Sequence, residues 1–183
     1  MFIQTETTPN PSTLKFLPGR PVLADGAREF RTPEAAAASP LAGALLSIDG
    51  VEAVMFGPDF VSVTKTDAEW THLKPAILGT IMEHFSSGAP IVIDAAEAAP
   101  AEFFDPADAE TVAQIKELIA TRVRPAVAND GGDITFRGFR DGIVYVVMKG
   151  SCSGCPSSTA TLKNGIENLL RHFVPQVRSV QQV

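Results

Sequence analysis

Residues 150–158 read Gly-Ser-Cys-Ser-Gly-Cys-Pro-Ser-Ser, and they hold both cysteines of the 183-residue chain, Cys152 and Cys155. An apolar, β-branched run at 143–148 precedes them and predicts a buried strand. A helix is predicted after them by apolar residues at helical spacing, namely Leu162, Ile166, Leu169 and Phe173. The segment therefore joins a strand to a helix in a domain that mixes both elements.

Pro156 suits the first position of that helix, which places Cys155 at or next to the helix N-terminus. Free N–H groups and the positive end of the helix dipole favour an anion there. We therefore expect a lowered thiol pKa and a thiolate, the form that binds metals or attacks disulfides. The motif by itself leaves open a metal or cluster site, a dithiol redox pair and inert structural cysteines.

Counting residues and ligands separates these alternatives. A thioredoxin-like fold places much of its sheet after the active helix, but only about ten residues follow Phe173, too few for two more paired strands. A mononuclear zinc ion needs four ligands. His172 lies about 24 Å along the helix from the cysteines, and His72 and His84 fall in the other half of the chain.

Two acidic residues, Asp130 and Asp133, fall near enough in the predicted fold to approach the cysteines. Their position in the run Asn-Asp-Gly-Gly-Asp at 129–133 is more typical of a turn and a cap than of metal ligands.

An iron–sulfur cluster typically takes four cysteine thiolates. One chain offers two, so a symmetric dimer that bridges the cluster across its twofold axis supplies the full set. A site held by two bonds from each subunit is exposed, which suits delivery of a cluster better than permanent electron transfer.

The first half of the chain alternates short β-branched runs with turn signals and two helical patterns, which predicts an α+β domain. Its predicted strands are 2–7, 14–17, 22–23 or 28–30, 51–56, 60–65 and 90–93. A short helix is predicted at 41–47. Asp67 is predicted to cap a longer helix that Pro75 either kinks or begins.

An Ala-, Pro- and acid-rich stretch separates the two halves. We therefore predict an N-terminal domain at 1–95, a linker at 96–107 and a C-terminal domain at 108–183. Phe103 and Phe104 indicate that part of the stretch packs on a domain. Both domains are expected to be small β-sheets packed with helices.

The second half starts at Asp105-Pro106, a helix cap followed by a first helical position. Its helix is predicted to kink or end at Pro125. A turn at 129–132, a strand from Ile134, a hairpin turn at 141–142 and a closing strand at 177–183 follow.

The formal net charge is −6, with nine basic and seven acidic residues in 108–183. This balance argues against a nucleic-acid or membrane-surface partner, each of which needs a strongly basic face. No apolar run approaches the roughly 20 residues of a spanning helix, and no secretory or transit pattern is evident. The chain is expected to be cytoplasmic, or the mature form of a protein imported into an organelle matrix.

Several blocks together resemble a known family. The C-terminal half resembles the NifU-like domain through Val-Arg-Pro at 123–125, Asn-Asp-Gly-Gly-Asp-Ile at 129–134, the cysteine segment at 150–158 and Thr-Leu-Lys-Asn-Gly-Ile-Glu at 161–167. The N-terminal half is similar to the Nfu-type N-terminal domain. That similarity is carried by Thr-Pro-Asn-Pro-Ser-Thr-Leu-Lys-Phe at 8–16 and Asp-Phe-Val-Ser-Val-Thr-Lys at 59–65.

The resemblance implies a non-enzymatic scaffold or carrier. Such a protein holds a [4Fe–4S] cluster, or a [2Fe–2S] cluster, between two subunits through Cys152 and Cys155 and passes it to apo-proteins. The implied partners are apo iron–sulfur clients, the cluster and sulfur donors of the assembly machinery, and a second copy of the chain when a cluster is bound. The N-terminal domain has no cysteine, and we expect it to dock partners. A dithiol oxidoreductase and a zinc-binding adaptor are the competing interpretations of the same pair.

Overall fold

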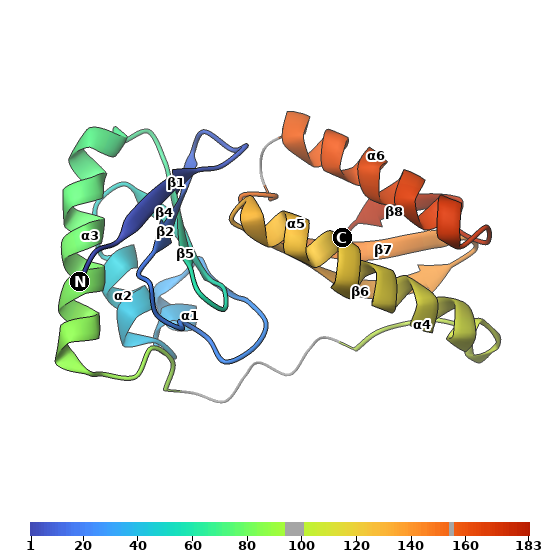
Figure 1. The fold of residues 1–183 in the computed structure, drawn as a ribbon, viewed down its shortest axis with the longest axis horizontal. Helices are drawn as coiled ribbons and strands as arrows, with labels where there is room; N and C mark the ends of the chain where they lie inside the picture. Colours follow the sequence, from blue (N-terminus) through green and yellow to red (C-terminus); the bar gives the residue numbers. More distant parts are fainter. Residues whose placement is uncertain (94–100, 154–155) are drawn as a thin grey trace. The chain divides into compact units, whose positions relative to one another are not determined.

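The computed structural model describes residues 1–93, 101–153 and 156–183, and the chain divides into two compact units, Met1–Glu97 and Ala98–Val183 (Figure 1). Each unit is a small β-sheet packed with helices, so the predicted α+β class with two domains is confirmed. Within the described ranges, no helix has both the length and the apolar character that a membrane span requires.

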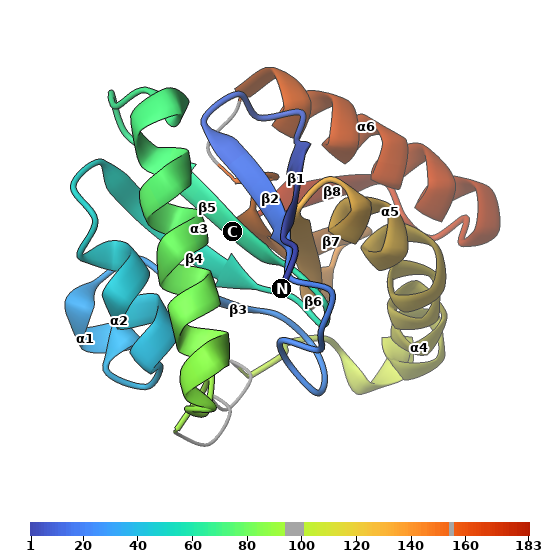
Figure 2. The same cartoon turned by 60° about the vertical axis from the view of Figure 1, so that its left-hand side comes forward.

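The first unit holds a five-stranded antiparallel sheet. In spatial order its strands are β1 (Gln4–Thr7), β2 (Thr13–Leu17), β5 (Val61–Lys65), β4 (Val51–Phe56) and β3 (Arg28–Phe30). Its helices are α1 (Pro33–Ala36), α2 (Pro40–Leu46) and α3 (Trp70–Ser87). Figure 2 shows all three helices on one side of this sheet.

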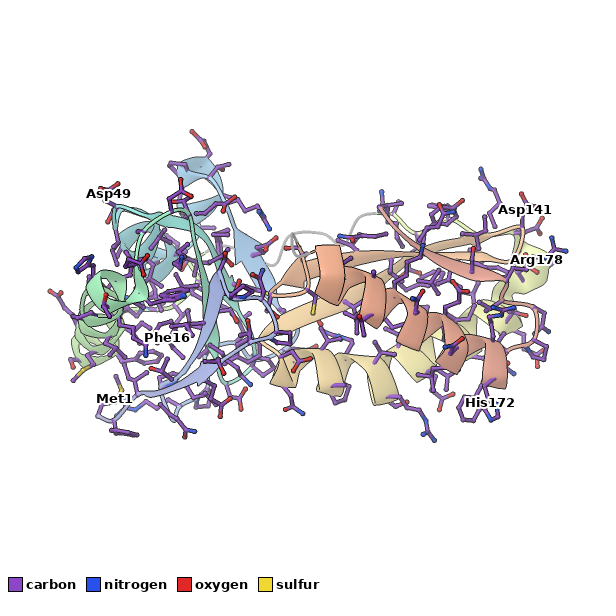
Figure 3. The ribbon with its side chains drawn as sticks, turned by 90° about the horizontal axis from the view of Figure 1, so that it is seen from above. Met1, Phe16, Asp49, Asp141, His172 and Arg178 are labelled. Atoms are coloured by element: carbon purple, nitrogen blue, oxygen red, sulfur yellow. The ribbon has the colours of Figure 1, made fainter. Side chains whose placement is uncertain are left out.

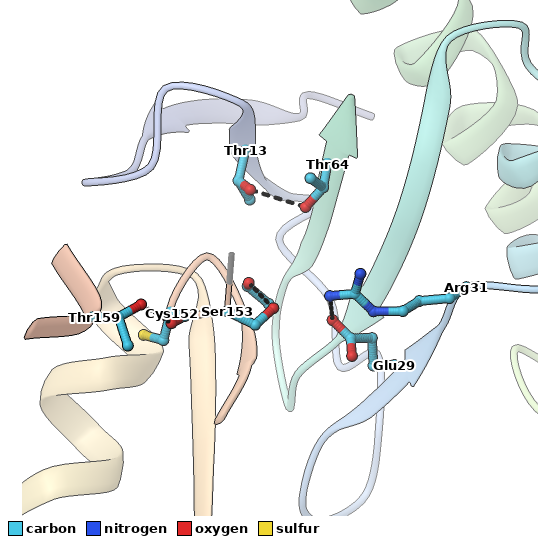
Figure 4. Close-up of polar contacts among 8 residues, drawn as sticks. Thr13, Glu29, Arg31, Thr64, Cys152, Ser153 and Thr159 are labelled. Atoms are coloured by element: carbon cyan, nitrogen blue, oxygen red, sulfur yellow. Dashed lines mark hydrogen bonds and ion pairs between the residues drawn. The ribbon is translucent and has the colours of Figure 1, made fainter. Parts of the chain in front are cut away.

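Alternation along β2 and β5 builds the core of the first unit. Leu14 pairs with Val63, and Phe16, labelled in Figure 3, pairs with Val61, so both pairs face the helices. One residue earlier, Thr13 pairs with Thr64 and their hydroxyl oxygens lie 2.8 Å apart, as Figure 4 shows. Apolar and polar side chains thus alternate along these strands, although the polar residues Thr13, Lys15 and Ser62 are buried too.

Two predictions for the first unit are wrong. The cap of α3 is Glu69 rather than Asp67, and Pro75 lies inside the helix. Residues 90–93 form no strand. The amide of Ile93 instead donates to the carbonyl of Ala38 at 2.8 Å, so this segment bonds to the junction between α1 and α2 rather than to a sheet edge.

The second unit has three strands, β6 (Gly132–Arg140), β7 (Ile143–Gly150) and β8 (Ser179–Gln182). Its helical elements are η1 (Pro106–Asp108), α4 (Ala109–Leu118), η2 (Ile119–Val123), α5 (Arg124–Asn129) and α6 (Pro156–Phe173). The hairpin β6–β7 turns at Asp141 and Gly142, both at positive φ as a tight primed turn requires. Helix α6 connects β7 to β8, which pair in parallel.

The helix before the Asn-Asp-Gly-Gly turn does not end at Pro125. It continues from α4 through the π-helical η2 into α5, and Pro125 sits in the first turn of α5, where a missing N–H is tolerated. Its buried residues recur every four positions, at Ile115, Ile119, Val123 and Val127. In a regular α-helix, residues spaced four apart rotate around the axis by about 40° at each step, so they would leave the buried face. The wider π turn offsets this rotation and keeps them on it.

Part of the predicted linker belongs to the second unit. Phe103 forms two backbone hydrogen bonds with β6. Its amide donates to the carbonyl of Arg137 at 3.2 Å, and its carbonyl accepts from the amide of Phe139 at 2.9 Å. Its ring lies 5.2 Å from that of Tyr145 and packs over Gly138. The expectation that this stretch packs on a domain is thus confirmed for Phe103. Residues 96–100 of the linker lie outside the described residues.

Candidate metal centre

Cys152 lies two residues beyond the end of β7. The strand ends at Gly150, whose φ of 69° turns the chain away from the sheet. Gly150 is paired with Gly132, the first residue of β6, so the loop that carries Cys152 leaves the sheet beside the Asn-Asp-Gly-Gly turn. The predicted ligand Cys155 falls outside the described residues, whereas helix α6 begins at Pro156 as predicted.

The thiol of Cys152 is packed into the core of the second unit. Its residue is 6% exposed and belongs to the hydrophobic cluster formed by the helices and the sheet. Gly132 lies against it: a Cβ atom built on Gly132 would be 2.6 Å from Sγ of Cys152 and 2.9 Å from the carbonyl oxygen of Lys149. The sulfur therefore occupies space that any larger residue at position 132 would need.

Ser151 forms hydrogen bonds between the loop that carries Cys152 and the turn at 129–132. Its hydroxyl donates to the backbone carbonyl of Asp130, and its amide donates to the carbonyl of Gly131 at 3.3 Å. The Oγ atom lies 3.9 Å from Sγ of Cys152. A serine hydroxyl has one hydrogen, so while it is given to Asp130, Ser151 can only accept from the thiol.

Hydroxyl groups also fix the two residues after Ser151. Thr159, in the second turn of α6, donates to the carbonyl oxygen of Cys152 at 3.0 Å, and Ser153 donates to the carbonyl of Gly150 at 2.9 Å. Figure 4 shows these three side chains at the junction of strand and helix. The loop is thus tied to the strand behind it and to the helix ahead of it.

The electrostatics of Cys152 differ from those expected for Cys155. Burial raises the pKa of its thiol to about 11, and the charges of Asp130 and Asp133 act in the same direction. The predicted lowering was argued for Cys155, which lies outside the described residues, and it does not extend to Cys152, whose sulfur loses its hydration in the core.

An ion pair supports the turn that faces Cys152. Arg124, the first residue of α5, donates from Nε to Oδ1 of Asp133 at 3.0 Å and from Nη2 to Oδ2 at 3.4 Å. The carboxylate of Asp133 is 7% exposed, so the pair compensates a buried charge. Asp133 thus has a structural partner, and its effect on Cys152 is electrostatic.

The histidines weighed as ligands lie elsewhere. His72 and His84 belong to α3 of the first unit, and His172 lies at the far end of α6, edge-on to Phe173 with ring centres 4.9 Å apart. Across the described ranges, no three His, Cys, Asp or Glu side chains gather closely enough to hold a metal ion. The cysteine pair therefore stays the candidate donor set.

Sequence reasoning missed the residues that surround Cys152. Ser151 and Arg124 stand in the blocks that carry the family resemblance, but no role was assigned to them or to Thr159, and Gly132 was interpreted only as part of a turn. The available signal was the double glycine at 131–132, because only Gly131 has the positive φ of the turn. The second glycine is needed for close packing against the sulfur.

Comparisons with known proteins cover both units. The family described as "Scaffold protein Nfu/NifU N terminal" matches residues 3–88, and the "NifU-like domain" matches residues 115–181. The chain is 53% identical to the human "NFU1 iron-sulfur cluster scaffold homolog, mitochondrial". It is also 53% identical to "NifU-like protein 4, mitochondrial" of Arabidopsis thaliana.

The alignments with these two relatives include the whole chain and 72% and 66% of the relatives' lengths. Among solved structures, the solution structure of a NifU-like protein from Saccharomyces cerevisiae is 27% identical, with a TM-score of 0.47. That match covers 52% of this chain and 87% of the yeast chain.

Proposed function

Because this chain belongs to the Nfu/NifU family of iron–sulfur cluster scaffold proteins, we propose that it holds a [4Fe–4S] cluster between two copies of itself and passes the cluster to apo-proteins. The ligands in this proposal are Cys152 and Cys155 of each copy. The chain is a scaffold rather than an enzyme, and the cluster is its cargo.

The observation that carries the proposal is the ligand count within the NifU-like unit. Cysteine occurs at two positions of the chain, both at the junction of β7 and α6. Iron–sulfur clusters are usually bound by four thiolates, and two copies supply that number. The pair lies in the short segment between β7 and α6, and a second copy related by a twofold axis supplies the same pair.

Transfer then requires only ligand exchange at iron. A client thiolate replaces Cys152 or Cys155, and the displaced sulfur takes up a proton from solvent. Burial favours the neutral thiol of Cys152, so its return to the core stabilises the emptied carrier. The proposed partners are apo iron–sulfur clients and the donors of iron and sulfur, and the N-terminal unit is proposed to dock them.

Two further assignments belong to this proposal. The [2Fe–2S] cluster is the alternative cargo, and Mössbauer spectroscopy distinguishes the two. Both relatives are named as mitochondrial proteins, which is consistent with the organelle-matrix expectation, while a cytoplasmic location stays a prediction.

Anaerobic reconstitution with iron and sulfide tests the proposal. The intact chain is expected to bind about four irons and four sulfides per dimer, whereas Cys152→Ser and Cys155→Ser each remove two of the four thiolates and abolish stable binding. His172→Ala, at the other end of α6, is the matched control and is expected to bind a full cluster. Full occupancy in either cysteine variant contradicts the proposal.

Two further assays, zinc uptake and reduction of a model disulfide, distinguish the competing functions. A zinc-binding adaptor takes up zinc without sulfide, and a dithiol oxidoreductase reduces a model disulfide while it binds no iron. Neither alternative is favoured by a contact in the described part of the chain.

A further inference from the structure

The bond between Ser151 and Asp130 has no role in the ligand count. Ser151 is 2% exposed, and its hydroxyl reaches across from the end of β7 to the carbonyl before the double glycine. The bond therefore spans two segments that are 21 residues apart in the chain. It joins the loop that carries Cys152 to the turn at 129–132, and Gly132 of this turn packs against the sulfur.

In this position the sulfur of Cys152 is closed to iron on the side of Gly132. A metal–thiolate bond is about 2.3 Å long, and Sγ lies so close to Gly132 that an added Cβ there would be 2.6 Å away. The residue is also 6% exposed, so a cluster shared with a second copy of the chain cannot reach the sulfur. Cys152 must move outward before it binds.

We infer that Ser151 is a positioning residue for cluster loading, because its bond to Asp130 holds Cys152 in a buried resting position and must open before the sulfur reaches iron. The inference rests on the proposed function. When the loop opens, the Sγ–Fe bond forms, the thiol proton passes to solvent, and a donor thiolate or water leaves the iron. No electron is transferred in this step.

The other bonds of the loop are compatible with such an opening. Thr159 holds the carbonyl of Cys152 from the side of α6, and Ser153 bonds locally to Gly150. The first contact ties the backbone of Cys152 to α6 and the second ties Ser153 to the end of β7, so neither holds the segment to the turn at 129–132. Release of the Ser151 hydroxyl from Asp130 leaves a second bond from this segment to the turn at 129–132, the amide of Ser151 to the carbonyl of Gly131 at 3.3 Å, which opening also breaks. Gly150 at positive φ is the point where the backbone direction already changes.

Alkylation of Cys152 tests the resting position directly. In a Cys155→Ser background, which leaves one thiol, Ser151→Ala is expected to raise the alkylation rate by iodoacetamide at constant pH about fivefold, as the loss of one net hydrogen bond implies. Thr121→Val is the matched control. It removes a hydroxyl that donates to the carbonyl of Glu117 at 2.7 Å in the same unit, and it is expected to leave the rate unchanged.

Loading kinetics test the consequence in the chain with both cysteines. Ser151→Ala is expected to acquire its cluster faster and to lose iron to a chelator faster, with the same final iron and sulfide content. A variant that is merely damaged has a lower final content instead. If wild type binds no cluster, the proposed function fails; if wild type binds one and Ser151→Ala loads no faster, only this inference fails.

Gly132→Ala provides an independent test if Ser151→Ala does not fold. The added methyl group occupies the place of the sulfur and expels Cys152 while Ser151 is intact. Alkylation is again expected to accelerate. An unchanged rate in this variant, with its circular dichroism spectrum preserved, overturns the buried resting position.

Discussion

The ring of Phe103 covers Gly138 so closely that a Cβ atom built on this glycine would lie 2.4 Å from Cζ of the ring. Gly138 sits at the irregularity of the β6–β7 pairing, where the register shifts between Phe136 and Gly138. The absence of a side chain therefore lets the segment before η1 lie flat against an edge strand, which otherwise offers unpaired backbone groups.

Gly138→Ala is expected to lower the free energy of unfolding of the second unit by about 1–3 kcal/mol, the usual cost of overpacking. Either the ring leaves its contact with Tyr145 or the strand bends. Gly165→Ala is the control in the same unit, because no atom lies within 4 Å of an added Cβ there. In the interior of α6 it is expected to stabilise by about 0.5–1 kcal/mol. Urea denaturation measures both, and equal effects contradict the packing of Phe103.

The domain boundary is tested by two fragments of the chain. Residues 105–183 are expected to fold and bind a cluster, and residues 101–183 are expected to be more stable by about 1–2 kcal/mol because they keep two backbone hydrogen bonds and a partly buried ring. Lys116 also keeps its partner Glu102, at 2.9 Å, in the longer fragment. Circular dichroism during urea denaturation compares them, and an unfolded longer fragment shows that the unit is not autonomous.

The pKa of Cys152 makes stability depend on pH in a definite direction. The folded chain holds the thiol proton up to about pH 11, whereas the ordinary pKa of the group is 9.0. The contribution is therefore fully present below pH 9 and is lost as the pH rises through 11. A shift of this size corresponds to roughly 2–3 kcal/mol.

Denaturation of the apo-protein between pH 8 and 10.5 measures this loss. Cys152→Ala removes the titrating group, so the difference between wild type and this variant isolates the thiol from other groups that titrate in the same range. The stability advantage of wild type is expected to shrink steadily above pH 9. An advantage that is constant with pH contradicts a buried neutral thiol.

Cluster binding is expected to convert the protein from a mainly monomeric form to a dimer, and transfer to a client is expected to reverse this. The reason is mass action, since a ligand that binds only the dimer stabilises the dimer. Light scattering on matched apo and holo samples gives the two masses. A monomer that carries a complete cluster refutes the bridging arrangement and directs attention to external thiols as ligands.

Local patterns predicted most of what surrounds the candidate site. The apolar run at 143–148 and the periodic residues after Pro156 were sufficient for β7 and α6, and the turn at 141–142 was sufficient for the hairpin with β6. These elements depend on period and turn chemistry, which are properties of neighbouring residues. The strand–helix junction that carries Cys152 followed from them.

The surroundings of Cys152 were not predictable in this way. The contact with Gly132 depends on the register of β6 against β7, and the bond from Ser151 depends on where that register leaves the turn at 129–132. The raised pKa of Cys152 was not predictable for the same reason, because a helix terminus is visible in a sequence and burial by distant segments is not. A helix end at Pro125, one of the two predicted outcomes, was wrong as well, since the helix continues through the π turn before this proline.

The π-helical turn at Ile119–Val123 also determines which changes of length the chain tolerates. Removing one residue there lets the backbone relax into a regular helix, and because a π turn holds one residue more than an α turn, the following residues keep their places around the axis. Val127 stays in the core, and Arg124 still faces Asp133. Homologous chains that share this site are therefore expected to tolerate a single-residue deletion within this turn, while a deletion in the regular helix on either side, which rotates every following residue by about 100°, is selected against.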